Sequence, residues 1–213
     1  MRTNTFFLTL LGCAMSVLGM QAAQKGIPAE LLKGRNASYD KSSNTLILED
    51  GYQYRLSKGL VVLETGKELR ILLKGNASFN ASVLSKDDIV IEAPSPATLS
   101  FTSNISGSAL TCPNLTVREN VTLNLLSRNS SNDMHALDCS GTLTVDSAVF
   151  CAETTTASLA VQVKETVLRR VRYEKPKGGI VSAEKGGICF GDGIPAKIVR
   201  IKPVQPKEKS TNF

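Results

Sequence analysis

The polar residues that could perform catalysis in this chain are few and poorly placed for it. His135 is the only histidine, which rules out a metal site built from several histidines. No Gly-x-Ser-x-Gly segment offers a nucleophilic serine to pair with it. Asp138 could be its neighbour, but a lone histidine at the end of a loop is more typical of an exposed or capping residue.

Paired carboxylates occur twice, at Glu49-Asp50 and at Asp87-Asp88. Glycoside cleavage requires two carboxyl groups that face one cleft about 5 to 9.5 Å apart. Adjacent residues of a strand point to opposite faces of the sheet, so neither dipeptide provides that arrangement. Asp87-Asp88 could contribute to a calcium site, but the sequence does not reveal the six to eight oxygen ligands that calcium takes.

Two glycine-rich stretches near the C terminus could in principle hold a phosphate. They are Gly178-Gly179 and residues 186–193, and neither continues into the Lys-Ser/Thr pair that a phosphate-binding loop requires. We interpret both as turns. Together with the preceding motifs, they lead us to predict no catalytic residue, no metal site and no cofactor.

Positive charge is concentrated near the C terminus. The chain has a net charge of +6, and residues 158–213 hold 12 Lys and Arg against 5 Asp and Glu. Strand alternation would place Arg170 and Arg172 on one face and Tyr173 on the other. With Lys175 they form a candidate strip that would attract an acidic polymer such as an anionic polysaccharide or lipopolysaccharide. The alternative is a solvated face followed by a basic tail. Other basic residues of this region are Lys164, Arg169, Lys177, Lys185, Lys197, Arg200 and Lys202, with Lys207 and Lys209 in the basic tail.

The N terminus is typical of an export signal. Arg2 is followed by an apolar run over residues 6–18 and then by small residues at Ala22 and Ala23. The run is shorter than the roughly 20 apolar residues that cross a bilayer, and no later run is longer, so we expect no transmembrane segment. Cleavage would deliver the chain to the periplasm, the outer surface or the medium, where we expect no nucleic-acid partner. A lipobox-like segment at residues 10–13 makes lipidation an alternative.

The rest of the chain has an all-β pattern. Apart from one short helical turn at residues 28–33, short aliphatic and β-branched runs alternate with Gly, Asn, Ser, Asp and Pro. Residues 108–117 align closely with residues 135–145, and weaker copies recur. Units of this size bury their apolar face only by stacking, so the sequence predicts a parallel β-helix of about six rungs. The equivalent apolar positions are Leu46, Leu69, Ile89, Leu115, Leu143 and Val167.

Four cysteines remain after signal cleavage: Cys112, Cys139, Cys151 and Cys189. In an oxidising compartment they permit disulfides in three pairings, and buried free thiols are the alternative. Cys112 and Cys139 occupy the same position of the repeat. Neighbouring rungs lie about 4.8 Å apart, within the Cα separation that a disulfide tolerates. We therefore predict that these two stack, as a thiol ladder or as a bridge.

Three elements together resemble one group of proteins. They are Gly75-Asn76-Ala77-Ser78 after the strand at residues 69–74, the successive Leu-Thr-Val strands, and the closing segment at residues 193–201. The chain is similar here to the small secreted β-helix proteins of anaerobic Gram-negative bacteria, which are carbohydrate-binding-like and mostly uncharacterised. The resemblance covers residues 36–201. It implies a right-handed parallel β-helix and supplies no catalytic residues.

An immunoglobulin-like β-sandwich is the alternative fold. Residues 146–152 resemble the strand that carries the second cysteine of an immunoglobulin variable domain, and residues 110–112 resemble the strand of the first. Seven Asn-x-Ser/Thr triplets would suit a glycosylated ectodomain. However, the chain has no Trp, and no Tyr precedes Cys151 by two residues.

These observations predict a signal peptide at residues 1–22, an N-terminal cap at 23–44, a β-helix domain at 45–202 and a mobile tail at 203–213. They favour an exported, non-catalytic module with a glycan-binding, adhesive or structural role. Its expected partner is a polysaccharide or a cell-envelope glycan. The alternative is a polysaccharide-active enzyme of the lyase-like β-helix type, which would need a groove that spans adjacent rungs.

Overall fold

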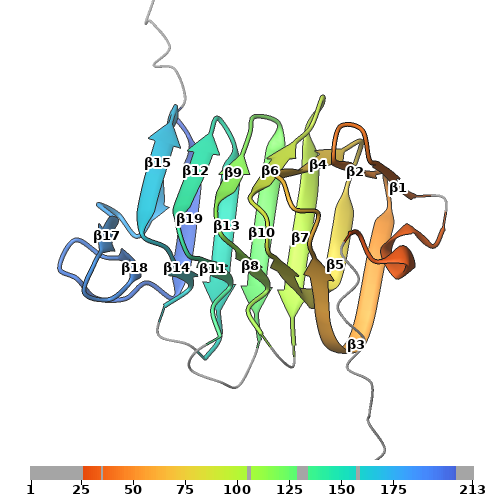
Figure 1. Ribbon diagram of the computed structural model, residues 1–213. Coiled ribbons are helices and arrows are strands. Elements are labelled where there is room, and N and C mark those ends of the chain that lie inside the picture. The colour runs from red at the N-terminus through yellow and green to blue at the C-terminus, as the bar shows by residue number, and fades with distance from the viewer. Residues whose placement is uncertain (1–25, 35, 105–106, 129–133, 157–158, 205–213) are drawn as a thin grey trace, which may run out of the picture.

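The chain forms a right-handed parallel β-helix of about five turns, as the repeats predict (Figure 1). The computed structural model describes residues 26–34, 36–104, 107–128, 134–156 and 159–204. The predicted signal peptide and nearly all of the predicted tail lie outside these residues. The sixth rung pairs with the fifth through its first strand alone, because two antiparallel strands from the end of the chain lie between its remaining strands and the fifth rung. The alternative of an immunoglobulin-like sandwich is wrong, because strands of successive rungs pair in parallel, whereas that sandwich is built from antiparallel sheets.

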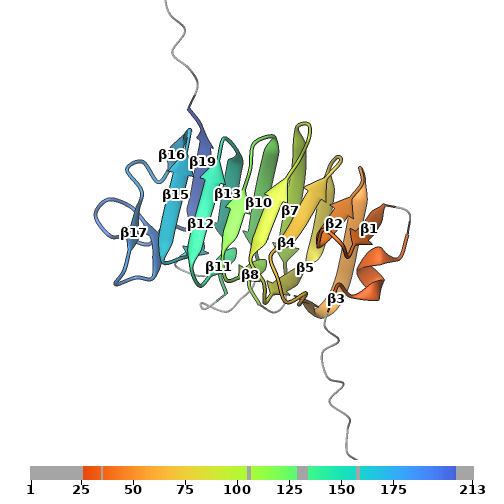
Figure 2. The same ribbon diagram turned by 45° about the horizontal axis from the view of Figure 1, so that its top comes forward.

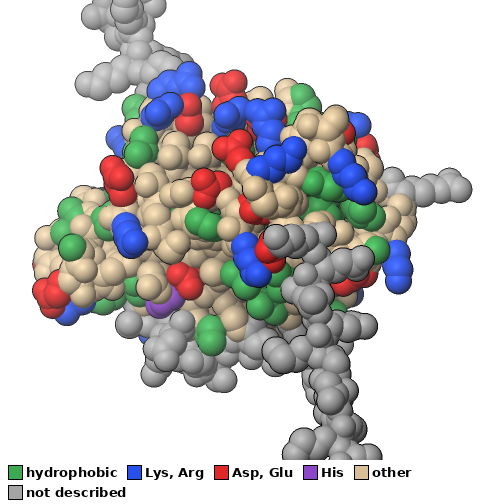
Figure 3. Space-filling model, viewed as in Figure 1, with side chains coloured by type: hydrophobic (Ala, Val, Ile, Leu, Met, Phe, Trp, Pro, Cys, Tyr) green, Lys and Arg blue, Asp and Glu red, His purple; other side chains and the backbone are tan. Residues whose placement is uncertain are grey.

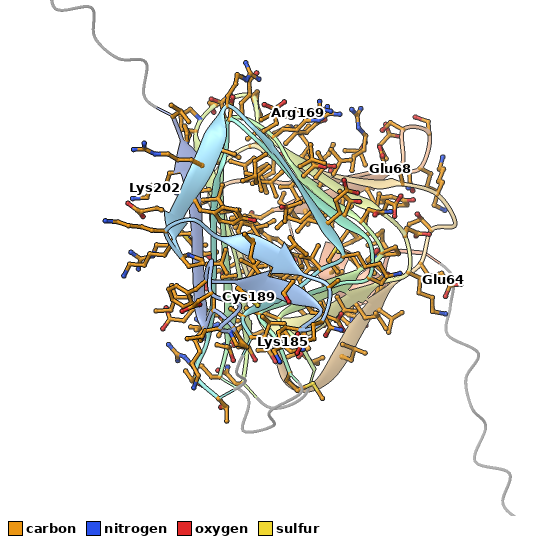
Figure 4. The ribbon with its side chains drawn as sticks, turned by 90° about the vertical axis from the view of Figure 1, so that its left-hand side faces the viewer. Glu64, Glu68, Arg169, Lys185, Cys189 and Lys202 are labelled. Carbon is orange, nitrogen blue, oxygen red and sulfur yellow. The ribbon has the colours of Figure 1, made fainter. Side chains whose placement is uncertain are left out.

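Each turn of the chain passes through three sheets, which give the helix a triangular cross-section (Figure 4). We number the sheets 1 to 3 in the order in which the chain enters them. Figure 2 shows the strands of sheet 1 in front of those of sheet 2, in the same order along the axis. Sheet 1 contains β1 (Ala37–Asp40), β2 (Thr45–Leu48), β4 (Leu69–Leu73), β6 (Ile89–Glu92), β9 (Leu115–Val117), β12 (Thr142–Asp146) and β15 (Glu165–Arg169).

Sheets 2 and 3 are joined, because β3 (Tyr52–Leu63) and β5 (Ala77–Ser85) each run through both. Sheet 2 continues with β7 (Ala97–Ser103), β10 (Val121–Ser127), β13 (Val149–Thr154), β19 (Ile198–Pro203) and β16 (Val171–Lys175). Sheet 3 continues with β8 (Leu110–Cys112), β11 (Leu137–Cys139), β14 (Val161–Gln162), β18 (Gly187–Cys189) and β17 (Ile180–Ser182).

Strand alternation directs apolar side chains inward and polar ones outward. In β7, for example, Ala97, Leu99 and Phe101 are buried, and the residues between them are partly exposed. Because the register is parallel, equivalent side chains stack from rung to rung. The rings of Phe79 and Phe101 lie 4.9 Å apart with an interplanar angle of 12°, and Tyr52 packs against Phe79. Burying such a side chain contributes about 1.5 to 3 kcal/mol.

Four of the six turns from sheet 1 into sheet 2 contain a residue in the left-handed conformation. Its φ angle is 75° at Gly51, 66° at Asn120, 52° at Ser147 and 58° at Arg170. This conformation costs a residue with a side chain about 1 to 2 kcal/mol. Arg170 therefore belongs to a turn and not to the strand that follows it.

Both ends of the helix are covered. At the N-terminal end, the 3₁₀ helix η1 (Ala29–Leu32) buries Leu31, whose carbonyl accepts a hydrogen bond from the hydroxyl of Tyr52 at 3.0 Å. At the C-terminal end, β19 and β18 pair antiparallel with β13 and β14. A Cβ atom at Gly187 would collide with the carbonyl of Val161, so this glycine permits the close approach of β18. Among the described residues, no helix is both long and apolar enough to span a bilayer.

Candidate functional site

The candidate functional site is the outer face of sheet 2, which we call the sheet 2 face. Its strands β7 and β10 are seven residues long, and their outward side chains are mostly small and polar. The register aligns one such residue from each rung into a central column: Gln53, Ser78, Ser100, Asn124 and Cys151. Neighbouring members are about 4.8 Å apart. Flanking columns add Asn80, Thr98, Thr102 and Thr122.

Shallow hollows follow one another along this face. The hollow over β7, β10, β13 and β19 has a volume of about 490 Å³, and its floor includes Ser100, Asn124 and Cys151. Two others, of about 300 and 410 Å³, lie over β3, β5 and β7. A fourth, of about 620 Å³, lies beside β16 and the end of β19. Lys202 lines both the first and the fourth hollow, so the polar surface is continuous toward the C-terminal end.

Four cations gather at that end, and we call them the cation array. They are Arg172 and Lys175 of β16 and Arg200 and Lys202 of β19, which the antiparallel register places opposite one another as Arg172–Lys202 and Lys175–Arg200. Arg200 is also the register partner of Cys151, so the array continues the central column. Figure 4 shows Lys202 pointing outward from this side of the triangle.

A β-bulge at Glu174 shapes the array. The register shifts between Tyr173 and Lys175, so Glu174 and Lys175 can both face solvent. Glu174 accepts a hydrogen bond from Nζ of Lys202 at 2.8 Å. This bond, with the charges of Lys202, Arg200 and Lys175, lowers the pKa of Glu174 below its ordinary value. Three cations of the array thus stabilise the ionised form of this one carboxylate.

Cys151 is a half-buried thiol that lines the hollow of about 490 Å³ over β7, β10, β13 and β19. Burial raises its pKa, and the charges of Arg200 and Lys202 act in the opposite direction. The other described cysteines are buried, and all four are free. Cys112 and Cys139 are register partners of β8 and β11, in agreement with the alignment of the repeats.

The outer face of sheet 1 has a different electrostatic arrangement. Glu92 accepts from Arg118 at 2.9 Å and lies 3.5 Å from Arg70, and Asp146 pairs with Arg170 at 2.9 Å. Each pair joins neighbouring rungs or their turns. Figure 3 shows positive and negative side chains next to each other over these strands. Each of these charged side chains therefore has an oppositely charged partner within the molecule.

The four residues of the predicted basic strip are separated by the structure. Arg172 and Lys175 belong to the cation array. Arg170 lies in the preceding turn and binds Asp146 of sheet 1. Tyr173 is half-buried on the other side of β16, and its hydroxyl is 3.2 Å from that of Thr166. Burial raises the pKa of Tyr173.

Arg200 and Lys202 complete the array, although the sequence indicated them only as later members of the basic region. They lie about 30 residues after Arg172 and reach it because β19 runs back along β16. A signal was present: both alternate with the buried residues Val199 and Ile201, which directs them to the outer face.

The other polar motifs support turns. Nδ1 of His135 is 2.7 Å from the carbonyl oxygen of Leu159 on the next rung, which agrees with a capping role. Asp138 points outward from the middle of β11, with its neighbours buried. Among the described residues, no three His, Cys, Asp or Glu side chains gather closely enough to hold a metal ion.

The paired carboxylates also connect successive rungs. Asp50 accepts from the backbone N–H of Asn76 at 2.8 Å, and Glu49 accepts from Lys74 at 2.8 Å. In the second pair, Asp87 accepts from the N–H of Gly66 at 3.1 Å and Asp88 accepts from Asn114 at 2.9 Å. Each of the four carboxylates thus binds a different group of a neighbouring rung, and we assign all four a structural role.

Comparison of the chain with family models, with curated proteins and with solved structures found no match.

Proposed function

We propose that this protein is exported and binds a polysaccharide or another cell-envelope glycan along the sheet 2 face without cleaving it. The observation that carries the proposal is the central column, which presents hydroxyl and amide groups from successive rungs along the floor of a shallow, elongated surface. Such groups both donate and accept hydrogen bonds, as sugar hydroxyls do. A polymer of repeating units would meet the same kind of side chain at every rung.

Two features of the sequence support this proposal. The N-terminal segment is typical of an export signal, and export would bring the protein to the glycans of the cell envelope. The resemblance to small secreted, carbohydrate-binding-like β-helix proteins agrees with a ligand of this class.

Aromatic stacking contributes little to the proposed binding. Tyr52 is buried, Tyr54 packs against Phe79, and Tyr173 bonds to Thr166. Rings that are held in this way do not form a flat platform for sugars. We therefore expect recognition through hydrogen bonds and charge.

Binding without cleavage is favoured by the carboxylates of the face. Among the described residues, Glu153 is the only carboxylate that lines the hollow around Asn124, whereas most glycoside hydrolases need two. A lyase-like enzyme is the alternative, because Arg200 and Lys202 border a groove that crosses several rungs. Such an enzyme would release unsaturated oligosaccharides.

The test is incubation of the chain lacking residues 1–22 with a panel of neutral and acidic polysaccharides. Affinity electrophoresis measures retention, and chromatography of the soluble fraction detects released oligosaccharides. We expect retention without release. Release would establish the enzyme, and retention by no polymer would overturn the proposal.

A pair of variants locates the binding. Asn124→Leu replaces an amide of the central column, and we expect the affinity to fall by about tenfold, the equivalent of about 1.4 kcal/mol. Thr116→Leu is the matched control, since Thr116 lies on the same rung in sheet 1 and is also partly exposed. The control should bind like the original chain.

A further inference from the structure

The cation array places like charges opposite one another on paired strands. The register brings Arg172 to Lys202 and Lys175 to Arg200. Side chains directly opposite in an antiparallel pair have Cβ atoms about 4.5 to 5.5 Å apart, and like charges there are destabilising. The arrangement therefore opposes folding unless a counter-charge is supplied.

The protein supplies little of that counter-charge itself. Lys202 pairs with Glu174. Among the described residues, no carboxylate lies within 4.0 Å of the charged nitrogens of Arg172, Lys175 or Arg200. The lowered pKa of Glu174 reflects the same excess, since Lys202, Arg200 and Lys175 all contribute to it. The arginines of sheet 1 that face Glu92 and Asp146, in contrast, are paired.

The array also continues the central column. Cys151 is the register partner of Arg200, and Arg200, Lys202 and Asn124 line one hollow. A polymer lying along the column would thus pass from uncharged hydrogen-bonding groups directly onto cations. Guanidinium groups bind carboxylates and sulfates with two parallel hydrogen bonds.

From these observations we infer that the cation array is a subsite for the anionic groups of an acidic polysaccharide, the carboxylates or sulfate esters on its sugars. This inference rests on the proposed function, because it assigns the ligand class of the same face. Arg200 is the central contact, since it borders both the column and Lys175.

The first measurement uses Cys151 as a reporter of the local potential. Iodoacetate and iodoacetamide alkylate the same thiolate, so the ratio of their rates depends on the field and not on the thiol pKa. The cations attract the anionic iodoacetate and not the neutral iodoacetamide. In Arg200→Gln/Lys202→Gln we therefore expect the rate with iodoacetate, divided by the rate with iodoacetamide, to fall by about threefold or more. Mass spectrometry of the peptide that contains Cys151 separates it from the buried cysteines. An unchanged ratio would overturn the inference.

The second measurement uses polymers that differ only in charge. Dextran sulfate should slow the reaction of Cys151 with neutral iodoacetamide about fivefold or more, and unmodified dextran should protect it less. The double variant should lose the added protection by dextran sulfate. Arg70→Gln/Arg118→Gln removes the same charge from sheet 1 and should retain the protection. Circular dichroism confirms that both variants are folded.

The outcomes distinguish the two proposals. Equal loss of protection in both double variants would show attraction to the whole protein and overturn the inference. Equal protection by phosphatidylglycerol vesicles at the same concentration of charge would indicate a lipid surface and overturn it as well. If the polysaccharide panel retains neutral and acidic polymers equally, the glycan-binding function stands and the anionic subsite fails. If the panel retains nothing, the proposed function itself fails.

Discussion

The outer faces of sheets 1 and 2 are built on the same rungs and use charge in opposite ways. Sheet 1 stacks Arg70, Glu92 and Arg118 in alternating sign, so each of these arginines has a carboxylate partner. The central column of sheet 2 is uncharged, and the face ends on four cations, of which Lys202 alone has an ion-pair partner among the described residues. In sheet 1 opposite charges of neighbouring rungs lie side by side, whereas in sheet 2 the antiparallel strand β19 places its cations opposite those of β16. A face with satisfied charges supports the fold, whereas one with unsatisfied cations is available to a ligand.

The largest expected effect is a difference in the free energy of unfolding between variants of the inner and the outer face of sheet 2. Phe101→Ala removes a fully buried ring that stacks on Phe79, and we expect it to lower the free energy of unfolding by about 3 to 5 kcal/mol. Ser100→Ala, next to it but outward, should change that free energy by less than about 0.5 kcal/mol. Urea denaturation measures both. Similar losses in the two variants would mean that Ser100 is structural.

The second prediction places a negative charge on each face in turn. Ser100→Asp adds a carboxylate to the central column, and we expect it to weaken the binding of dextran sulfate about tenfold through repulsion. Thr144→Asp adds the same charge to a partly exposed position of sheet 1 and should leave the affinity unchanged. Isothermal titration calorimetry gives both dissociation constants. An equal loss in the two variants would contradict a site on sheet 2.

The third prediction concerns the ion pairs of sheet 1. Glu92→Gln removes the partner of two partly exposed arginines, and because solvent screens such pairs we expect a loss of about 0.5 to 1 kcal/mol in the free energy of unfolding. High salt should abolish the difference from the original chain. Arg200→Gln should cause no such loss, since it relieves repulsion. Destabilisation by Arg200→Gln would show that the array stabilises the fold.

The smallest expected effect is a pH dependence of binding. The pKa of Glu174 is lowered, so its ion pair with Lys202 is present above the ordinary carboxyl pKa and is lost as the pH falls through the lowered value. Loss of the pair frees Lys202, and dextran sulfate, which stays ionised, should then bind about twofold more tightly. Glu174→Gln should bind more tightly at neutral pH and show a smaller increase on acidification. Calorimetry at neutral and acidic pH measures the change, and an identical increase in the variant would contradict the role of Glu174.

The buried side chains and the predicted turns could be predicted from local patterns in the sequence. The alternation in β7 and the repeat shared by β8 and β11 predict which side chains face inward and which residues stack, including Cys112 on Cys139. The short helical turn near Leu31 also followed from its residues. The basic strip was predicted less well. Strand alternation assigned Arg170 to the same strand as Arg172, but that strand begins one residue after Arg170.

What the sequence by itself determined is the parallel β-helix and its inner face, because period-two alternation and a recurring unit are properties of consecutive residues. The tertiary structure alone decided where the cations gather. Two non-repeating events produce the array: the bulge at Glu174 and the return of β19. Each depends on contacts between segments distant in the chain, and no repeat encodes them. The outer face of sheet 2 acquires its charge in this way, from residues that the sequence placed about 30 positions apart.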